Sequence, residues 1–330
     1  MSPNETEQAT GSGVQTPEIA VVIATRNRET RLAFALEALA AQTLGTERFE
    51  VIVVRTADSL EPFCEVPPTL RTRFFVSSVA GPAVQRNLGW RAAEAPLIVF
   101  TDDDCRPPAD WLERLSDARD GEMTMLQGRT EPDPDEAHLY WGLARSWVIT
   151  EENEWYATCN MAYPRALLER LEGFDERFPS AWGEDTDLGL RARELGASQR
   201  YVDDALTRHA VLSRSLPKAI REARRHEGSV MVVARHPAYR SELCWRYFAH
   251  VRHARLLLAL SGLLAVRSSP KISAMATFPY LWASFDLRKP FFNARGIARQ
   301  TAHLPVRLCL DLTEVFVFAR ASVRERVFLL

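Results

Sequence analysis

The sequence predicts an α/β fold in which a mostly parallel sheet is followed by a helical C-terminal extension. In the first hundred residues, short and almost continuous apolar runs alternate with helical patterns. Such runs are typical of parallel strands covered on both faces, and their alternation with helices is the order of an α/β sheet. From residue 216 on, the pattern is helical and basic. At 330 residues, the chain is long enough for one large domain and an appendage.

Each element of the predicted sheet domain has its own signal. The first strand is expected at residues 18–24, and Asn27 is a suitable N-cap for the helix after it, in which leucines repeat at helical spacing. Three further apolar runs predict strands at 49–54, 73–77 and 97–101. Three more helices are expected, from Pro82 to about Ala93, over 165–171 and over 184–195.

The extension at residues 216–330 carries apolar segments that are too short to span a membrane. Its two apolar stretches, 254–266 and 273–285, fall below the roughly 20 residues that cross a bilayer. Residues 306–330 predict an amphipathic helix, which suits either a bundle packed on the body or an anchor lying in the plane of a membrane. Its polar stripe comprises Arg307, Asp311, Glu314, Ser322 and Glu325, and its apolar stripe comprises Leu308, Leu312, Val315, Phe316 and Ala319.

Charge is distributed unevenly along the chain. Residues 1–215 hold 22 Lys and Arg against 36 Asp and Glu, whereas residues 216–330 hold 19 against 7. An acidic body with a basic tail favours contact between the tail and an anionic surface, and a solvated basic face is the plain alternative. We expect peripheral contact with an anionic membrane and no nucleic acid partner.

The cysteines and the N-terminus indicate the compartment. The five cysteines are widely spaced and form no CxxC pair, which argues against a zinc module or a disulfide framework and fits a reducing cytosol. Residues 1–17 are polar, lack the pattern of a signal peptide and are expected to be a disordered arm. We therefore expect a cytoplasmic protein that can lie peripherally on the inner face of the plasma membrane.

Three consecutive carboxylates, Asp102, Asp103 and Asp104, directly follow the predicted strand at 97–101. Adjacent carboxylates repel one another and need a compensating cation. Hard oxygen ligands favour Mg²⁺ or Mn²⁺, which commonly bridge to phosphate oxygens. A solvated acidic loop is the alternative interpretation, but the buried strand in front of the acids favours a metal site.

Polar groups follow three of the predicted strands, at Thr25, at residues 55–58 and at residues 102–104. Because ligands of open parallel sheets bind at the carboxyl ends of the strands, these groups should converge on one crevice. Neither a P-loop nor a glycine-rich dinucleotide fingerprint is present in the sequence.

Four motifs stand in order along the chain: Ala24-Thr25-Arg26-Asn27, the segment 81–89, Thr101-Asp102-Asp103-Asp104, and the segment 182–191, which contains Glu184-Asp185. Each motif alone is weak, but the ordered set is specific. Together they resemble family 2 glycosyltransferases with the GT-A fold, over about residues 18–235. The C-terminal helices resemble, more loosely, the extensions of many bacterial members.

The resemblance implies an inverting transfer of a sugar from a nucleotide-diphosphate donor to the hydroxyl of a carbohydrate, lipid-linked or small-molecule acceptor. Such a displacement needs a base for the hydroxyl and an electrophile for the leaving diphosphate. Asp185 is implied as the base, with Glu184 and Trp182 binding the acceptor. The alternative is that Glu184 and Asp185 are ordinary acids in the first turn of a helix, where they meet the positive end of its dipole.

The same resemblance assigns the metal and the donor. Asp102 and Asp104 match the DXD motif and would hold Mn²⁺ or Mg²⁺, with His209 as a third ligand. The second strand departs from the family pattern, because residues 55–59 replace a paired-Asp turn. Recognition of the nucleobase therefore depends on Asp58. Arg86 could pair with a phosphate of the donor or hold the loop that carries the DXD motif. The implied donor-binding residues are Thr25, Asn27, Asp58, Arg86 and Asp103.

Two other functions stay open at this point. A sugar nucleotidyltransferase shares an α/β nucleotide sheet, but it needs a glycine-rich loop after the first strand, and residues 25–29 contain no glycine. A catalytically silent nucleotide-sugar-binding or scaffold protein would not need both the triple Asp and the Glu184-Asp185 pair.

Overall fold

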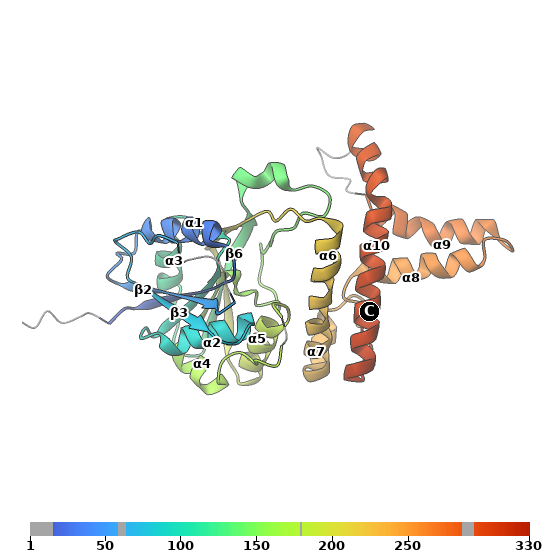
Figure 1. Ribbon diagram of the computed structural model, residues 1–330. Helices are drawn as coiled ribbons and strands as arrows, with labels where there is room; N and C mark the ends of the chain where they lie inside the picture. Colours follow the sequence, from blue (N-terminus) through green and yellow to red (C-terminus); the bar gives the residue numbers. More distant parts are fainter. Residues whose placement is uncertain (1–15, 59–63, 179, 286–293) are drawn as a thin grey trace, which may run out of the picture.

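The computed structural model describes residues 16–58, 64–178, 180–285 and 294–330, so most of the predicted arm lies outside the described residues. One eight-stranded sheet forms the centre of the body (Figure 1). Its strands are β1 (Ile19–Thr25), β2 (Phe49–Thr56), β3 (Thr72–Ser77), β4 (Leu97–Asp102), β5 (Cys105–Arg106), β6 (Thr124–Pro132), β7 (Met161–Pro164) and β8 (Ser198–His209). Their order across the sheet is β3-β2-β1-β4-β7-β6-β8-β5.

The sheet is parallel in its first half and mixed in its second. β1 lies between β2 and β4 and pairs with both in parallel, with Ile19 opposite Phe49 and Leu97. β7 is antiparallel to β4 and β6, and β5 is antiparallel to β8. The predicted strands in the first hundred residues are confirmed within two residues at each end. β5 and β7 are too short to show a period of two in the sequence.

Helices cover both faces of the sheet. Their bounds in the body are α1 (Glu29–Ala40), α2 (Pro82–Ala92), α3 (Trp111–Asp117), α4 (Arg165–Leu171) and α5 (Glu184–Glu194), with short 3₁₀ turns η1 (Pro134–Leu139) and η2 (Thr158–Asn160). α1 and α3 pack on one face with Val21 and Ile23 of β1. α2, α4 and α5 pack on the other face with Ala20 and Val22. Successive side chains of a strand point to opposite faces, so this one strand contributes to both cores.

The prediction that Asn27 caps the first helix is wrong by one residue. α1 begins at Glu29, and its N-cap position is Arg28, without a side-chain capping bond. Asn27 has φ 53°, in the left-handed region that asparagine tolerates better than most residues. The chain therefore turns at Asn27, before the helix, and places Arg28 beside the acids that follow β4.

The elements from residue 216 on are helical. They are α6 (Leu216–Ala223), η3 (Arg224–His226), α7 (Glu227–Arg235), η4 (Pro237–Glu242), α8 (Val251–Leu264), α9 (Pro270–Ala283) and α10 (Ala294–Glu325). α10 packs along α6 and α7, while α8 and α9 pack on each other as a hairpin that projects away from the sheet (Figure 1). Gly262 permits this close packing, because a Cβ there would lie 2.5 Å from that of Ala276.

The amphipathic helix α10 turns its polar stripe towards the other helices. Asp311 is fully buried and accepts a hydrogen bond from the hydroxyl of Tyr280 on α9 (3.0 Å). Glu314 pairs with His253 of α8 (3.0 Å). On the opposite side, the apolar side chains Leu312 and Phe316 are 40% and 67% exposed. Leu308, Leu312 and Phe316 of the apolar stripe therefore lie outside the core, whereas Val315 of the same stripe packs against α8 and α9. Among the described residues, no helix combines the length and the apolar character that crossing a bilayer requires.

Candidate active site

Thr25 and Arg28 contact the acids that follow β4. The Thr25 hydroxyl donates to Oδ2 of Asp103 (2.7 Å). Arg28 donates to Oδ1 of Asp103 (3.0 Å) and to Oδ2 of Asp104 (2.8 Å). Burial raises the pKa of Asp103, and the Arg28 guanidinium opposes this shift. The chain thus supplies part of the positive charge that the clustered carboxylates need. Sequence reasoning missed Arg28, although it stands directly after Asn27.

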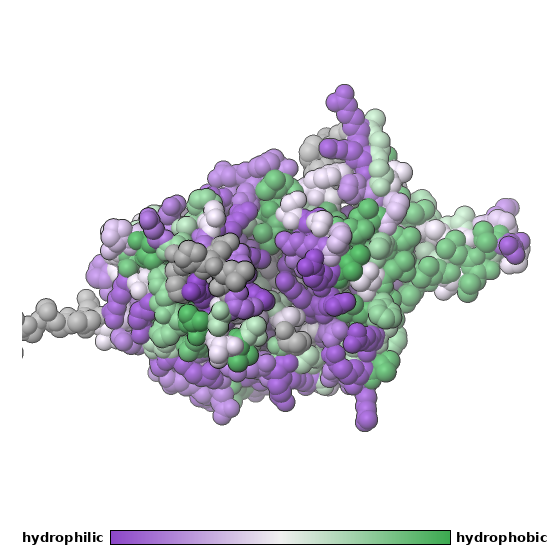
Figure 2. All heavy atoms as spheres, viewed as in Figure 1, coloured by the Kyte–Doolittle hydropathy of each residue, from purple (hydrophilic) through white to green (hydrophobic). Residues whose placement is uncertain are grey.

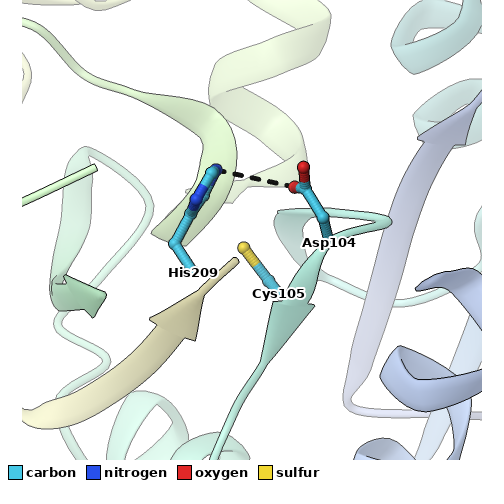
Figure 3. A group of neighbouring side chains, drawn as sticks. All are labelled: Asp104, Cys105 and His209. Carbon is cyan, nitrogen blue, oxygen red and sulfur yellow. Dashed lines mark ion pairs between the residues drawn. The ribbon is translucent and has the colours of Figure 1, made fainter. Parts of the chain in front are cut away.

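Asp104, Cys105 and His209 form a group that could hold a metal ion (Figure 3). β5 pairs with β8 so that Cys105 lies opposite His209. Nδ1 of His209 lies 2.8 Å from the carbonyl oxygen of Ala210. Because a carbonyl can only accept, Nδ1 is the donor in this contact, and Nε2 faces Oδ1 of Asp104 at 3.5 Å. A metal-binding histidine commonly donates from its other ring nitrogen to a backbone carbonyl, so this donor set fits a divalent metal.

Cys105 is the member of this group that the sequence interpretation did not include. Its thiol is buried and donates to the carbonyl of Cys159 (3.7 Å). Burial raises the pKa of the Cys105 thiol, which disfavours the thiolate that binds metals. The oxygen of Asp104 and the imidazole of His209 are therefore the better ligands in the group. The sequence signal for Cys105 is only its position next to Asp104.

Arg86 joins the acids of β4 to the first turn of α5. From α2 it donates to Oδ1 of Asp102 (3.2 Å) and to Oε1 of Glu184 (2.8 Å). Its guanidinium also lies over the ring of Phe174, at 5.8 Å from the ring centroid. The side chain of Arg86 is only 7% exposed, and that of Glu184 is 2% exposed. The triple Asp and the Glu184-Asp185 pair, about eighty positions apart in sequence, are thus held together by one buried cation.

Asp185 is fixed by the turn η2, which precedes β7. Both the backbone N–H and the hydroxyl of Thr158 donate to Oδ2 of Asp185, each at 3.2 Å. Within the described part of the chain, no hydrogen bond reaches the other carboxylate oxygen, Oδ1. Asp185 is half-buried, so Oδ1 can meet a ligand. The residue Thr158 gave no signal in the sequence.

The neighbours of Asp185 differ in how accessible they are. Burial raises the pKa of Glu184, as does the charge of Asp185, while Arg86 lowers it. Since the Glu184 carboxylate faces Arg86, its predicted contact with an acceptor stays a prediction. Trp182 is half-buried and donates from Nε1 to the hydroxyl of Ser229 on α7 (2.7 Å). Asp187 points away from Asp185 and pairs with Arg191 and His236.

The remaining predicted donor residues lie around the ends of β1 and β2. Asp58 is about half-exposed and pairs with Arg26 (2.5 Å). The side chain of Thr56 and this arginine lower the pKa of Asp58. The left-handed turn at Asn27 separates Arg26, which pairs with Asp58, from Arg28, which pairs with Asp103. Thr25 thus contacts Asp103 directly, Asp58 joins the same segment through Arg26, and Arg86 is buried between Asp102 and Glu184.

Comparisons with known proteins show what this chain is similar to. Residues 20–178 match the model of the family described as glycosyl transferase family 2, so the match ends just before Glu184 and Asp185. A validoxylamine A glucosyltransferase of Streptomyces hygroscopicus subsp. limoneus is 26% identical over 293 residues, covering 71% of this chain and 60% of the relative. The glycosyltransferase AglE of Haloferax volcanii is 23% identical over 209 residues, covering 58% of this chain and 67% of the relative.

The chain therefore spans less than two thirds of the length of the first of these relatives. Among solved structures, the mannosyltransferase PcManGT of Pyrobaculum calidifontis, in complex with GDP-Man and Mn²⁺, superposes with a TM-score of 0.55 at 20% identity. The superposition covers 94% of this chain and 88% of that protein. The predicted GT-A fold is confirmed.

Proposed function

From the family 2 glycosyltransferase domain that residues 20–178 form, we propose that this chain is an inverting glycosyltransferase that uses a nucleotide-diphosphate sugar. One observation carries the proposal. Arg86 contacts both Asp102 and Glu184, so the donor acids lie beside the turn that carries the candidate base Asp185. An inverting displacement needs this arrangement, because donor and base must flank the same reacting carbon.

Asp104 and His209 would hold the metal, for which Mn²⁺ and Mg²⁺ are the candidates. Asp102 lies outside this group and pairs with Arg86, and it is proposed as a further ligand. When bound, a divalent ion stabilises the negative charge that develops on the leaving diphosphate. Thr25 and Arg28 keep Asp103 and Asp104 in place. Asn27, Asp58 and Asp103 are proposed to contact the nucleoside.

Asp185 is the proposed general base. Thr158 holds its Oδ2, which orients the carboxylate and leaves Oδ1 to take the proton of the acceptor hydroxyl. Glu184 and Arg86 fix the turn that carries Asp185, and the buried charge pair keeps the turn from shifting. Trp182 is proposed to contact the acceptor.

A donor screen tests this proposal. UDP-, GDP- and dTDP-hexoses would be added to the full chain with and without MnCl₂, and the melting temperature would be measured. A donor at a hundred times its Kd stabilises the native state by about 2.7 kcal/mol. We expect a metal-dependent increase with at least one donor, and slow release of the nucleoside diphosphate without acceptor. An increase without any hydrolysis or transfer would favour the silent binding protein, and no increase with any donor would overturn the proposal.

We also propose that the C-terminal extension contacts an anionic membrane surface. The hairpin of α8 and α9 exposes large apolar side chains, seen as the apolar projection in Figure 2. Leu264 is 89% exposed, Met275 75% and Phe278 60%. Between residues 243 and 285 the sequence contains five Arg or Lys and no Asp or Glu. An apolar surface with only positive charge suits insertion among anionic head groups.

α10 carries exposed apolar side chains of its own. Leu308, Leu312 and Phe316 line an open apolar hollow on the helix. Contact with a membrane at this surface agrees with the predicted in-plane anchor, although the sequence pointed to α10 and not to the hairpin. An acceptor carried by a lipid would then be held near the crevice. The predicted cytoplasmic location stays a prediction.

A further inference from the structure

The extension helix α7 packs against α5, the helix whose first turn carries the candidate base Asp185. Near the start of α7, Gly228 lies against the backbone that leads into α5, and a Cβ there would be 1.7 Å from the carbonyl oxygen of Trp182. Further along, Val232 of α7 belongs to the same buried apolar cluster as Leu188 of α5. The two helices are therefore in close contact, which only a glycine at position 228 permits.

A buried histidine at the end of α7 joins this helix to α5. Nδ1 of His236 lies 2.7 Å from Oε1 of Glu194, and Nε2 lies 3.1 Å from Oδ1 of Asp187. Because ionised carboxylates can only accept, both hydrogen bonds form only when both ring nitrogens carry a hydrogen, as they do in the imidazolium. The hydrogen bond to Asp187, with that to Glu194, raises the pKa of His236 against the opposing effect of burial.

Charged groups from three segments meet around the Asp187 end of this histidine. On α5 itself, Arg191 donates to Oδ2 of Asp187 (2.8 Å). On α7, Arg235 lies 3.3 Å from Oδ1 of Asp187 and 2.7 Å from Oδ2 of Asp175, which belongs to the segment before α5. A neutral His236 has one donor for two carboxylates, so loss of its proton removes one of the two bonds that it makes to α5.

These contacts act on the turn that carries the candidate base. From the body, Thr158 binds one oxygen of Asp185. From the extension, His236 binds Asp187, which lies two positions further along in the same first turn of α5. The direction of the other oxygen of Asp185 therefore depends on where this turn lies. A displacement of about 1 Å in a reacting group can reduce a rate about a hundredfold.

We propose that His236 is a positioning residue for the candidate base, because its imidazolium holds Asp187 and with it the first turn of α5. This rests on the proposed function, in which Asp185 takes the proton. The folded-state pKa of His236 is raised, so its contribution is present at low pH and is lost as the pH rises through that pKa. The catalytic rate should fall in the same range, while donor affinity, which depends on groups after β1 and β4, should not change.

Hydrogen exchange of the full chain, measured by mass spectrometry between pH 6 and pH 9, tests the contact without any donor. After correction for the intrinsic effect of pH, we expect the amides of α5 to exchange about tenfold faster in His236→Ala, and faster in the unaltered protein at high pH. His236→Arg keeps a charged donor and should stay protected throughout. His253→Ala, which removes another buried histidine–carboxylate pair, is the matched control and should leave α5 unchanged. Equal exchange of α5 in all four proteins would overturn the proposal.

Kinetics separates this inference from the proposed function. With a donor found by the screen, release of the nucleoside diphosphate in His236→Ala should show kcat lower by about tenfold or more and an unchanged donor KM. His236→Arg should restore most of kcat and remove the decrease at high pH.

Two results would overturn the positioning role while the transferase assignment survives. One is a kcat in His236→Ala that falls no more than in His253→Ala. The other is an unchanged pH profile in His236→Arg, which would assign the decrease to another group such as Glu184. If α5 responds in the exchange experiment but no donor is used, the proposed function fails and the proton-dependent contact between α7 and α5 stands.

Discussion

Replacing Arg86 by methionine should destabilise the protein more than the loss of any surface arginine. Arg86 is 7% exposed and neutralises Glu184, whose carboxylate is 2% exposed, so the variant leaves this carboxylate buried without a partner. Asp102, the other partner, is 25% exposed and can be solvated. Breaking a buried ion pair by removing one member typically costs about 3–5 kcal/mol. For a chain of this length, about 2 °C per kcal/mol predicts a decrease of roughly 6–10 °C in Tm.

The loss of stability in Arg86→Met should depend on pH. Burial already raises the pKa of Glu184, and Arg86 is the group that opposes this shift. In Arg86→Met the folded-state pKa of Glu184 therefore rises further above its unfolded value. A group with a raised folded pKa binds more protons when folded, so stability falls as the pH rises through that pKa. Burial raises the pKa of Glu184 to about 8 even with Arg86 in place, so we expect a small deficit at pH 5.5, where the carboxyl is protonated in both proteins, and a deficit that grows as the pH rises to 8.5 and above.

Thermal unfolding of the full chain, followed by circular dichroism at both pH values, measures the effect. Adding Glu184→Gln to Arg86→Met should recover at least half of the lost stability, because the uncompensated charge is removed. Arg114→Met, which breaks an exposed pair with Asp110, is the control and should change stability by less than about 0.5 kcal/mol. A decrease for Arg86→Met that equals the control, or one that is the same at both pH values, would refute the buried ion pair.

Three further predictions concern the metal, the base and the membrane. Asp104→Asn should abolish the Mn²⁺-dependent increase in Tm with donor while leaving the fold intact by circular dichroism, and an unchanged increase would remove Asp104 from the metal site. Asp185→Asn should lower kcat about a hundredfold or more with nearly unchanged donor affinity in binding assays, whereas a loss of donor binding would make Asp185 a binding residue. Leu264→Gln with Phe278→Gln should weaken co-sedimentation with anionic vesicles about tenfold or more, because fully burying each side chain contributes about 1.5–3 kcal/mol. The same change at Val79, which is 55% exposed on the body, should have no effect, and equal binding by all variants would exclude the hairpin as the contact.

The sequence by itself determined the local elements and the order of the motifs. The strands before Thr25 and Asp102 are continuous apolar runs, and the start of α5 at Glu184 follows from Gly183 and the acids in its first turn. These features depend on neighbours within a few positions, which periodicity and capping describe. The convergence of the strand ends also follows from the parallel order of β1, β2 and β4.

The contacts that complete the candidate site join residues far apart in the chain, and only the tertiary structure decided them. Arg86 reaches Glu184 98 positions away, and Thr158 reaches Asp185 27 positions away. Cys105 meets His209 because the short strand β5 pairs with the end of β8, and the two residues of β5 show no periodicity in the sequence. The prediction that Asn27 caps α1 was wrong because Asn27 has a left-handed backbone conformation. This turn places Arg28 against Asp103, which is distant in the sequence.

The amphipathic pattern of α10 predicts that this helix has a polar and an apolar face, but it does not predict which face is buried. A helix normally buries its apolar face, since burial of apolar surface is the main favourable term in folding. Here α8 and α9 supply His253 and Tyr280 to the polar face, and these partners offset the desolvation of Glu314 and Asp311. Leu312 and Phe316 then remain outside, while the helix buries other apolar side chains, Leu310 and Phe318, against α6 and α7. Its orientation depended on partners more than thirty positions earlier in the chain, which no pattern within the helix could identify.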